Sequence, residues 1–479
     1  MRPTALLPTR PGARRVCHRA LRPLVATLSL IAPLASSVAQ TAAAPLQSGP
    51  MVGWVDMREA RLWVQTTRPA RVQFTYWDST APARRWTTAA QLTSAATAHT
   101  ATLLADSVRP GRTYHYALRI DGREVPRPYA LRFRTPPITG PGRDSVPTFR
   151  IALGSCYYVP DAEYDRPGQP YGTNLRIMSA VAATKPDLML WLGDNTYLRE
   201  ADWTSRTGVL HRWTHTRSEP FLQPLLGGTA QLATWDDHEY GPNDADRSYG
   251  LKGVTREAFD LFFPMPPNAA AAGGVYRMVE FGDVAIFLLD DRWFRSPNAR
   301  AGGDRTYWGE QQREWLIDAL RFSRATFKLV ANGGQILSPL AVFENASTYP
   351  AERDALLARI AEERIGGVVF LSGDRHHTEL VQMRRDSTRV RTAPRDPSSS
   401  MTVQPLYPLY DLTISPLTAG VSTGNEANPW RVDGTYVRQH NFATLDVQGP
   451  RGERVLVMTV RGVEGDVLWT RELRARDLR

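Results

Sequence analysis

Short runs in which hydrophobic and polar residues alternate cover the chain from about residue 49 to residue 135. Val72, Phe74 and Tyr76 alternate with polar neighbours, and the same period of two recurs over residues 114–120 and 131–133. This period is typical of strands with one buried face, and the pair Asp121-Gly122 favours a tight hairpin turn. The pattern predicts a small all-β sandwich over residues 48–136.

A different pattern follows the Pro- and Gly-rich segment 137–147, which we interpret as a linker. Continuous apolar runs now alternate with stretches of helical composition, the latter at residues 174–183, 309–321 and 351–363. Alternation of this kind predicts a layered α/β domain over residues 148–479. Alternating residues at 455–460 and 467–469 predict closing antiparallel strands, and the Arg-, Pro- and Ser-rich segment 386–400 predicts an exposed loop.

The first 39 residues have the composition of a secretory signal peptide. Six arginines precede or begin the apolar run 24–34, no acid is present, and Ser37-Val38-Ala39 supplies a small-residue cleavage site. The surroundings of Arg14-Arg15 fit a twin-arginine signal poorly, so the general secretory route is favoured. We expect an exported protein, periplasmic or extracellular, and no later apolar stretch is long enough for a transmembrane segment.

The net charge gives no support to nucleic-acid binding. The formal net charge is +10, and removal of the six leader arginines lowers it to +4. The remaining basic residues do not cluster with aromatic ones, as they would on a nucleic-acid interface.

Four apolar strands end in residues that can carry chemistry. The strings are GSC at 154–156, GDNTY at 193–197, WDDHEYGPND at 235–244 and GDRHH at 373–377. Because the carboxyl ends of parallel strands meet at one edge of a sheet, these side chains are expected to converge. Asp, His and Tyr together are the hard oxygen and nitrogen donors of a metal-assisted hydrolase.

Cys156 is the single cysteine after the leader, since Cys17 lies inside it. An internal disulfide is therefore excluded in the exported chain. Cys156 is either a small buried hydrophobic residue or a reactive or metal-binding thiolate. Its place at a strand end beside three other such strand ends favours the second interpretation.

The acidic strings suggest individual roles. Asp194 can bridge two cations with its two oxygens, and Tyr197 follows one short turn later. The four ionisable groups at 236–239 would repel one another at a strand end without a cation or partner. A solvated acidic loop is the alternative, but the flanking Trp235 and Tyr240 favour burial. His238 would then act as a general acid or as a donor to an oxyanion, and Asn243 or Asp244 would complete the pocket.

Two further strand ends carry candidates. Asp374 and His376 are expected on the same side of an extended backbone, whereas His377 would point away and be structural. Asp290 and Arg292 follow the apolar run 284–289. Arg292 suits bidentate contact with a phosphate, and an ion pair with a local acid is the alternative.

Taken together, these motifs resemble the PhoD-type alkaline phosphatases of the calcineurin-like metallophosphoesterase superfamily. The resemblance runs over roughly 300 residues, and the sandwich is similar to the immunoglobulin- or fibronectin-like domain that often precedes that fold. The strings that carry it, in order, are GSC, LGDNTY, TWDDHEYGPND, LLDDRWFR, GEQQREWL, YPAER, LSGDRHHTEL and LYDLTISPLT.

The resemblance implies a binuclear or trinuclear centre that contains Fe³⁺ and Ca²⁺. Position by position, it implies that Asp194 bridges the metals and that Asp237 and Asp374 serve the second cation or cations. Gln335 stands where other members of the superfamily have a histidine ligand, a departure that suits an oxygen-preferring calcium ion. The implied iron ligands are Cys156, Asp194, Tyr197 and His376.

The implied function is that of an exported, metal-dependent phosphoric ester hydrolase, in which metal-bound hydroxide attacks phosphorus and His238 and Arg292 assist. A phosphodiesterase or phospholipase D-like activity on the same fold is the nearest alternative. A second is an inactive protein that binds envelope material loosely through the sandwich. We expect the sandwich to be dispensable for chemistry unless it covers a core face of the larger domain.

Overall fold

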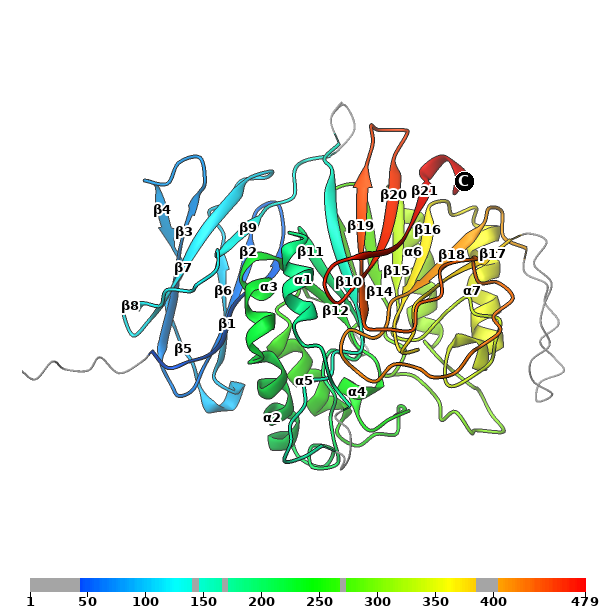
Figure 1. Ribbon diagram of the computed structural model, residues 1–479, viewed down its shortest axis with the longest axis horizontal. Coiled ribbons are helices and arrows are strands. Elements are labelled where there is room, and N and C mark those ends of the chain that lie inside the picture. The colour runs from blue at the N-terminus through cyan, green and yellow to red at the C-terminus, as the bar shows by residue number, and fades with distance from the viewer. Residues whose placement is uncertain (1–43, 140–145, 166–170, 268–272, 385–403) are drawn as a thin grey trace, which may run out of the picture. The chain divides into compact units, whose positions relative to one another are not determined.

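The computed structural model describes residues 44–479 apart from 140–145, 166–170, 268–272 and 385–403 (Figure 1). The expected signal peptide and the expected loop 386–400 therefore lie outside the described residues. The predicted linker is described in part. Residues 44–479 form a single compact unit by their internal contacts.

Two antiparallel sheets form an all-β region at the N-terminal end of the described chain. Along β3 every second residue is buried, which is the period that the sequence predicted. The Asp121-Gly122 hairpin joins β7 to β8, with positive φ at both turn residues. One sheet holds β1 (Leu46–Val55), β2 (Ala60–Thr66) and β6 (Thr100–Ala105), and the other holds β3 (Arg71–Asp78), β4 (Arg85–Thr87), β5 (Gln91–Leu92), β7 (Thr113–Ile120), β8 (Arg123–Glu124) and β9 (Arg132–Arg134).

Two mixed sheets of six strands each make up the α/β region of the described residues. In the first sheet β10, β11 and β12 are parallel, and in the second β14, β15, β16 and β18 are parallel. The first has the order β12 (Ala230–Thr234), β11 (Leu188–Leu192), β10 (Phe149–Gly154), β19 (Asn441–Gln448), β20 (Val455–Gly462), β21 (Val467–Arg474); the second has the order β13 (Arg277–Phe281), β14 (Val284–Leu288), β15 (Phe327–Ala331), β16 (Val368–Ser372), β18 (Leu409–Thr413), β17 (Glu379–Met383).

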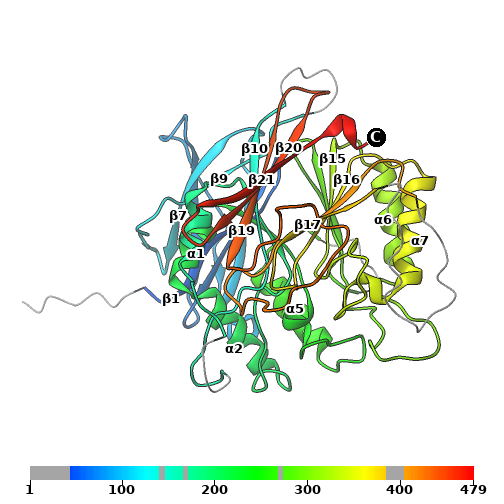
Figure 2. The ribbon, with the colours of Figure 1, turned by 45° about the vertical axis from the view of Figure 1, so that its right-hand side comes forward.

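Helices lie outside these two sheets (Figures 1 and 2). Helices α6 and α7 flank the second sheet, and their positions agree with the helical stretches predicted from the sequence. The helices are α1 (Ile177–Ala183), α2 (Arg206–Arg217), α3 (Gln223–Gly228), α4 (Asp237–Tyr240), α5 (Lys252–Phe262), α6 (Glu310–Phe322) and α7 (Pro350–Glu362). The expected fold class, a layered α/β domain preceded by a small all-β sandwich, is therefore confirmed.

The all-β region packs against the larger region through its first sheet. Trp63 is fully buried, its indole Nε1 donates to the Leu261 carbonyl at 2.8 Å, and its ring centroid lies 5.8 Å from that of Phe262. The Gly49 amide donates to Gln223 Oε1 at 2.8 Å. The sandwich thus covers a core face of the larger region. We expected the sandwich to be dispensable for chemistry unless it covered such a face, so that condition is not met. The boundaries of the domains remain a prediction.

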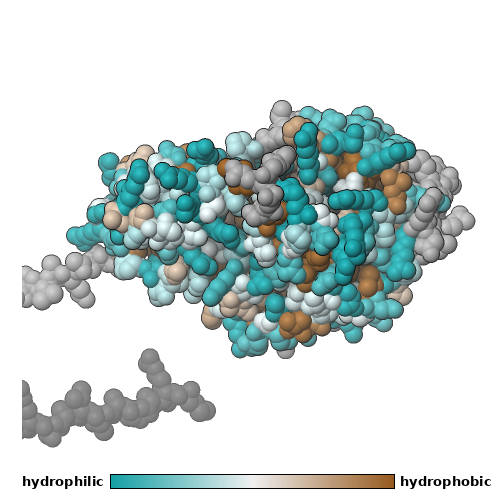
Figure 3. Space-filling model, turned by 90° about the horizontal axis from the view of Figure 1, so that it is seen from above, coloured by the Kyte–Doolittle hydropathy of each residue, from teal (hydrophilic) through white to brown (hydrophobic). Residues whose placement is uncertain are grey.

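The surface of the described chain is mainly hydrophilic from the side drawn in Figure 3, where hydrophobic residues occur singly or in small groups. Among the described helices, none combines the length and the apolar character needed to cross a membrane.

Candidate metal centre

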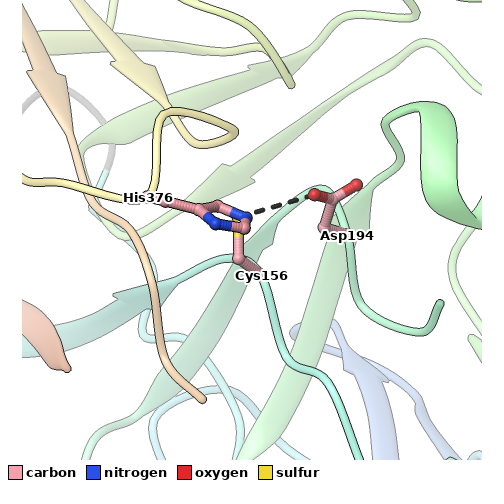
Figure 4. Close-up of side chains that lie close together, drawn as sticks. All are labelled: Cys156, Asp194 and His376. Carbon is pink, nitrogen blue, oxygen red and sulfur yellow. Dashed lines mark hydrogen bonds between the residues drawn. The ribbon is translucent and has the colours of Figure 1, made fainter. Parts of the chain in front are cut away.

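The strand ends named by the sequence do converge. Cys156 follows β10, Asp194 follows β11 and His376 follows β16, and their side chains point toward one another (Figure 4). Cys156 Sγ lies 3.5 Å from Asp194 Oδ2. The Tyr197 hydroxyl donates to the same oxygen at 3.0 Å and lies 3.3 Å from His376 Nε2. One ligand atom each from Cys156, Asp194 and His376 lie within 4.8 Å of one another.

Left-handed backbone turns these side chains inward. The φ angles are 58° at Cys156, 54° at Asp194, 64° at Asp374 and 54° at His376. Cysteine seldom adopts this conformation, and strained backbone of this kind clusters at functional sites. The segment from Asp374 to His376 is therefore a turn, so the extended backbone assumed in the sequence argument for their common orientation was wrong.

Burial keeps the first group of donors neutral in the absence of a cation. It raises the pKa of the Cys156 thiol to about 12 and lowers the pKa of His376 to about 4. Burial also raises the pKa of Tyr197 well above its ordinary value. Thiolate and phenolate would therefore form only when a positive charge compensates for desolvation.

Two neighbours orient this group. The Ser415 hydroxyl donates to Cys156 Sγ at 3.0 Å and accepts from the His376 amide at 2.9 Å. The Tyr171 hydroxyl lies 3.2 Å from His376 Nδ1, which leaves Nε2 facing Tyr197. Such contacts fix the ring nitrogen that is free to bind a metal. Sequence reasoning did not single out Tyr171 or Ser415.

A second group of donors shares Asp194. Ligand atoms of Asp194, Asp237 and His238 lie within 4.8 Å of one another. The ring of His238 packs on that of Tyr197, with centroids 4.1 Å apart. Burial lowers the pKa of His238, so this side chain is neutral near pH 7 in the metal-free protein.

A third group was missed in part by sequence reasoning. Asp236, Asp237 and Glu344 are all buried, and their carboxylate oxygens also lie within 4.8 Å of one another. Glu344 belongs to a loop between β15 and α7 and does not follow a strand directly, so it lacked the signal that identified the others. Asp374 is a further carboxylate here, and burial raises its pKa to about 7.

Arg292 lies among these carboxylates. It is fully buried and forms ion pairs with Asp236 and Glu344 through Nη2. The ion pair that the sequence argument left as an alternative is therefore present. Burial would raise the pKa of Glu344, but Arg292 and Arg295 outweigh that effect and lower it. Contact of Arg292 with a phosphate stays a prediction.

The remaining candidates are Asn243, Asp244 and Gln335. Asn243 and Asp244 are exposed, and the Asp244 amide donates to Asp237 Oδ2 at 2.8 Å, so both belong to the rim. Gln335 is buried and its amide nitrogen donates to Glu379 at 2.8 Å and to Thr413 at 2.9 Å.

His377 and Asp290 occupy neighbouring polar networks. His377 is fully buried, its Nε2 lies 3.7 Å from Glu379 Oε1, and its ring packs on Tyr436. Asp290 accepts hydrogen bonds from the backbone amides of Val275, Arg292 and Trp293. The Asp290 contacts fix local structure after β14, whereas neither ring nitrogen of His377 makes a hydrogen bond within the described residues.

Glu239 joins two of the chemistry-bearing loops. Its carboxylate accepts from the backbone amides of Asp194 at 2.9 Å, Asp236 at 3.1 Å and Asn195. The loops approach so closely that a Cβ on Gly193 would lie 2.7 Å from Asp236 Cβ. Gly193, with φ of 90°, is therefore required at this position.

The residues present fit bound cations. Asp236 Oδ2, Asp374 Oδ2 and His238 Nδ1 are buried and make no hydrogen bond to the protein. Unpartnered buried polar atoms are costly, and several carboxylates in one buried cluster repel one another. Both costs disappear when cations bind between them.

Comparison with known proteins agrees with this geometry. A family model described as PhoD-like phosphatase matches residues 155–406, more than half of the chain. A second, described as a domain of unknown function (DUF7800), matches residues 43–138. Alkaline phosphatase D of Bacillus subtilis (strain 168) is 27% identical over an alignment of 329 positions, and the match covers 58% of this chain and 53% of that protein. The matched part thus spans about half the length of this curated relative.

Solved structures share the fold. A structure of PhoD superposes with a TM-score of 0.70 at 17% identity and covers 91% of this chain and 92% of its own. The purple acid phosphatase PPD1 from yellow lupin seeds gives a TM-score of 0.63 at 12% identity and covers 90% and 74% of the two chains. The resemblance inferred from the motifs is confirmed: the chain belongs to the PhoD-like phosphatase family.

Proposed function

We propose that this protein is a metal-dependent phosphoric ester hydrolase. The observation that carries the proposal is the chain of three buried donor groups, in which Asp194 belongs to two groups and Asp237 belongs to two. Shared carboxylates of this kind suit cations that lie close to one another. The name of the Bacillus subtilis relative, alkaline phosphatase D, supports a phosphate ester as the substrate.

The ligand assignment follows from the groups. Cys156, Asp194, Tyr197 and His376 would hold one cation, and Asp237 and Asp374 would serve the other cation or cations, with Asp194 as the bridge. Asp236 and Glu344 extend the carboxylate set beyond the sequence-based assignment. When bound, the metal ions would supply an activated water nucleophile and neutralise charge on the phosphate.

The protein's own side chains would position the phosphate and assist the departure of the leaving oxygen. His238 lies beside Tyr197 and Asp194 and is neutral near pH 7 in the metal-free protein, so its ring N–H would donate a hydrogen bond to a phosphate oxygen. To pass a proton to the leaving oxygen, His238 would first have to take one up and become imidazolium. Arg292 orients Asp236 and Glu344. Its guanidinium would reach a phosphate when a cation draws one of these carboxylates away. Asn243, on the rim, would contact the substrate.

The donor types suggest which metals bind. Thiolate and phenolate together favour ferric iron at the first group, whereas a set of carboxylates favours calcium at the others. An iron centre with a phenolate ligand should absorb visible light. Tyr197→Phe should shift or bleach that band, and Tyr407→Phe, which alters a buried tyrosine bonded to the Val368 amide, is the control. A colourless, fully active enzyme would refute the iron assignment.

The leader supports a site of action outside the cytoplasm. Its arginines, apolar run and small-residue cleavage site are the features of an exported chain. We infer a periplasmic or extracellular enzyme that acts on phosphate esters there. Loose association with envelope material through the sandwich is a secondary proposal.

Hydrolysis assays test the function directly. The metal-loaded protein should release product from 4-nitrophenyl phosphate, and comparison with bis(4-nitrophenyl) phosphate distinguishes a monoesterase from a diesterase. Asp194→Asn should abolish activity while the protein stays folded, since the carboxylate is shared by two donor groups. Asp318→Asn, an exposed change on α6, is the matched control. Absence of hydrolysis of both esters by metal-loaded protein would refute the proposal and favour a binding protein.

A further inference from the structure

Phe343 is an exposed aromatic residue next to the candidate metal centre. Its side chain is 74% exposed, in contrast to its neighbour Glu344, which is buried in the third donor group. The two residues form a turn in the loop between β15 and α7. The same turn thus presents a carboxylate to the cations and a phenyl ring to solvent.

The backbone at Phe343 is strained. Its φ is 52°, and Phe343 is the one large apolar side chain among the non-glycine residues with positive φ in the described part of the chain. A bulky residue in this region is a genuine outlier. Holding Phe343 in left-handed backbone opposes folding, and its exposed ring gains little burial to offset that cost. Strain of this kind is concentrated at ligand-binding sites.

A guanidinium holds the ring beside the centre. Arg375 Cζ lies 4.1 Å from the Phe343 ring centroid, and Arg375 Nη1 lies 3.9 Å from Asp374 Oδ2. With a C–N bond of about 1.3 Å between these two contacts, the ring centroid lies within about 10 Å of the Asp374 carboxylate. Arg375 is itself buried and pairs with Glu426, so the guanidinium is a fixed support.

The ring therefore has one supported face and one open face. The face on Arg375 is fixed by a cation–π contact, while the high exposure leaves the rest of the ring in solvent. Open aromatic faces bind planar apolar groups by stacking. A phosphate held at the cations would place its ester group within reach of this ring.

We propose that Phe343 is a specificity-determining residue that stacks on a planar aromatic leaving group, such as an aryl or nucleobase-bearing alcohol, of a phosphate ester bound at the metal centre. The inference rests on the proposed function, because it names the substrate class of that same site. It assigns Arg375 the role of a positioning residue beneath the ring.

Substitutions at Phe343 distinguish the effect of the aromatic ring from the effect of the backbone turn. Phe343→Asn and Phe343→Gly remove the ring and favour left-handed backbone, so the turn that carries Glu344 is preserved. Phe343→Trp keeps an aromatic face. Phe322→Asn is the matched control, since Phe322 is 83% exposed at the end of α6, which leads into the opposite end of β15.

Kinetics with two leaving groups test the proposal. For 4-nitrophenyl phosphate, Phe343→Asn and Phe343→Gly should lower kcat/KM about tenfold, mainly through KM, as expected for lost aromatic contact. For glycerol phosphate the change should stay within about twofold. Phe343→Trp and Phe322→Asn should retain the preference. An equal loss with both esters, or no loss with either, would overturn the proposal.

A binding measurement separates failure of this inference from failure of the proposed function. If the wild-type protein hydrolyses neither ester, the proposed function fails, and calorimetry with phenylphosphonate and methylphosphonate on metal-loaded protein then decides the role of Phe343. Tighter binding of phenylphosphonate, lost in Phe343→Asn, supports the aromatic subsite. Equal affinity for the two phosphonates, or binding of neither, contradicts it.

Discussion

Substitution of Glu239 by glutamine would test how the two loops of the metal centre are held together. Glu239 is fully buried and accepts hydrogen bonds from the backbone amides of Asp194, Asn195 and Asp236. Burial raises the pKa of Glu239 to about 8, and these amide donors oppose the rise. Glutamine has nearly the same shape but a single acceptor oxygen in place of two.

The expected cost follows from these three bonds. In Glu239→Gln one amide donor would face the new NH₂ group and lose its partner, at a cost of about 1–3 kcal/mol. At a pH above about 8, where the carboxylate is ionised, loss of its negative charge would weaken the other two bonds by roughly 1 kcal/mol in total. We expect a free energy of unfolding lower by about 3 kcal/mol. Because the entropy of unfolding is about 2 cal/mol/K per residue, Tm should fall by only about 3 °C in a chain of this size.

Calorimetry at a pH above about 8, together with metal analysis, would check this expectation. The loops that carry Asp194 and Asp236 should loosen, so Glu239→Gln should also retain less metal after dialysis. Glu314→Gln is the matched control, because Glu314 is 51% exposed and pairs with Arg359 at the surface. If Glu239→Gln matches this control in both Tm and metal content, the carboxylate does not hold the loops and the reasoning is wrong.

Three further predictions concern the site and the sandwich. His238→Ala should lower kcat by roughly a hundredfold with metal retained, and loss of metal instead would make His238 a ligand. Trp63→Ala should lower the free energy of unfolding by about 4 kcal/mol, and an unchanged urea midpoint would contradict the packing of the sandwich on α5. In the metal-free protein, burial lowers the pKa of His376 to about 4, so His376 binds more protons in the unfolded state and its own contribution to stability should be lost as the pH drops from about 6.5 toward 4. The wild-type protein should therefore lose stability relative to His376→Asn over this pH range, and a difference between the two that stays constant in chemical unfolding at several pH values would contradict a buried neutral His376.

Much of the fold could be read from periodicity. Buried strands such as β11, β12 and β16 are continuous apolar runs, and the period of two in β3 and β7 marks half-buried strands. Helix α2 was not predicted, because its sequence is largely polar and includes two buried arginines, Arg212 and Arg217. Its burial depends on tertiary ion pairs and ring contacts that a local pattern does not show.

The site was predictable where a residue directly follows a strand. Cys156, Asp194, Asp237 and His376 meet this condition, and the structure brings them together. Glu344 and Tyr171 come from long loops, so only the tertiary fold brings them to the centre. The packing of the sandwich on α5 could not be predicted either, since it depends on a contact between Trp63 and Phe262, which are about 200 residues apart in the sequence.

The central claim is that hydrolysis depends on cations held by Asp194 and its neighbours. The most direct measurement is the titration of metal-stripped protein with iron and calcium while release of 4-nitrophenol from 4-nitrophenyl phosphate is followed. We predict negligible activity without metal and a rise that saturates at two or more equivalents per chain. Full activity in protein shown to be metal-free would contradict the claim.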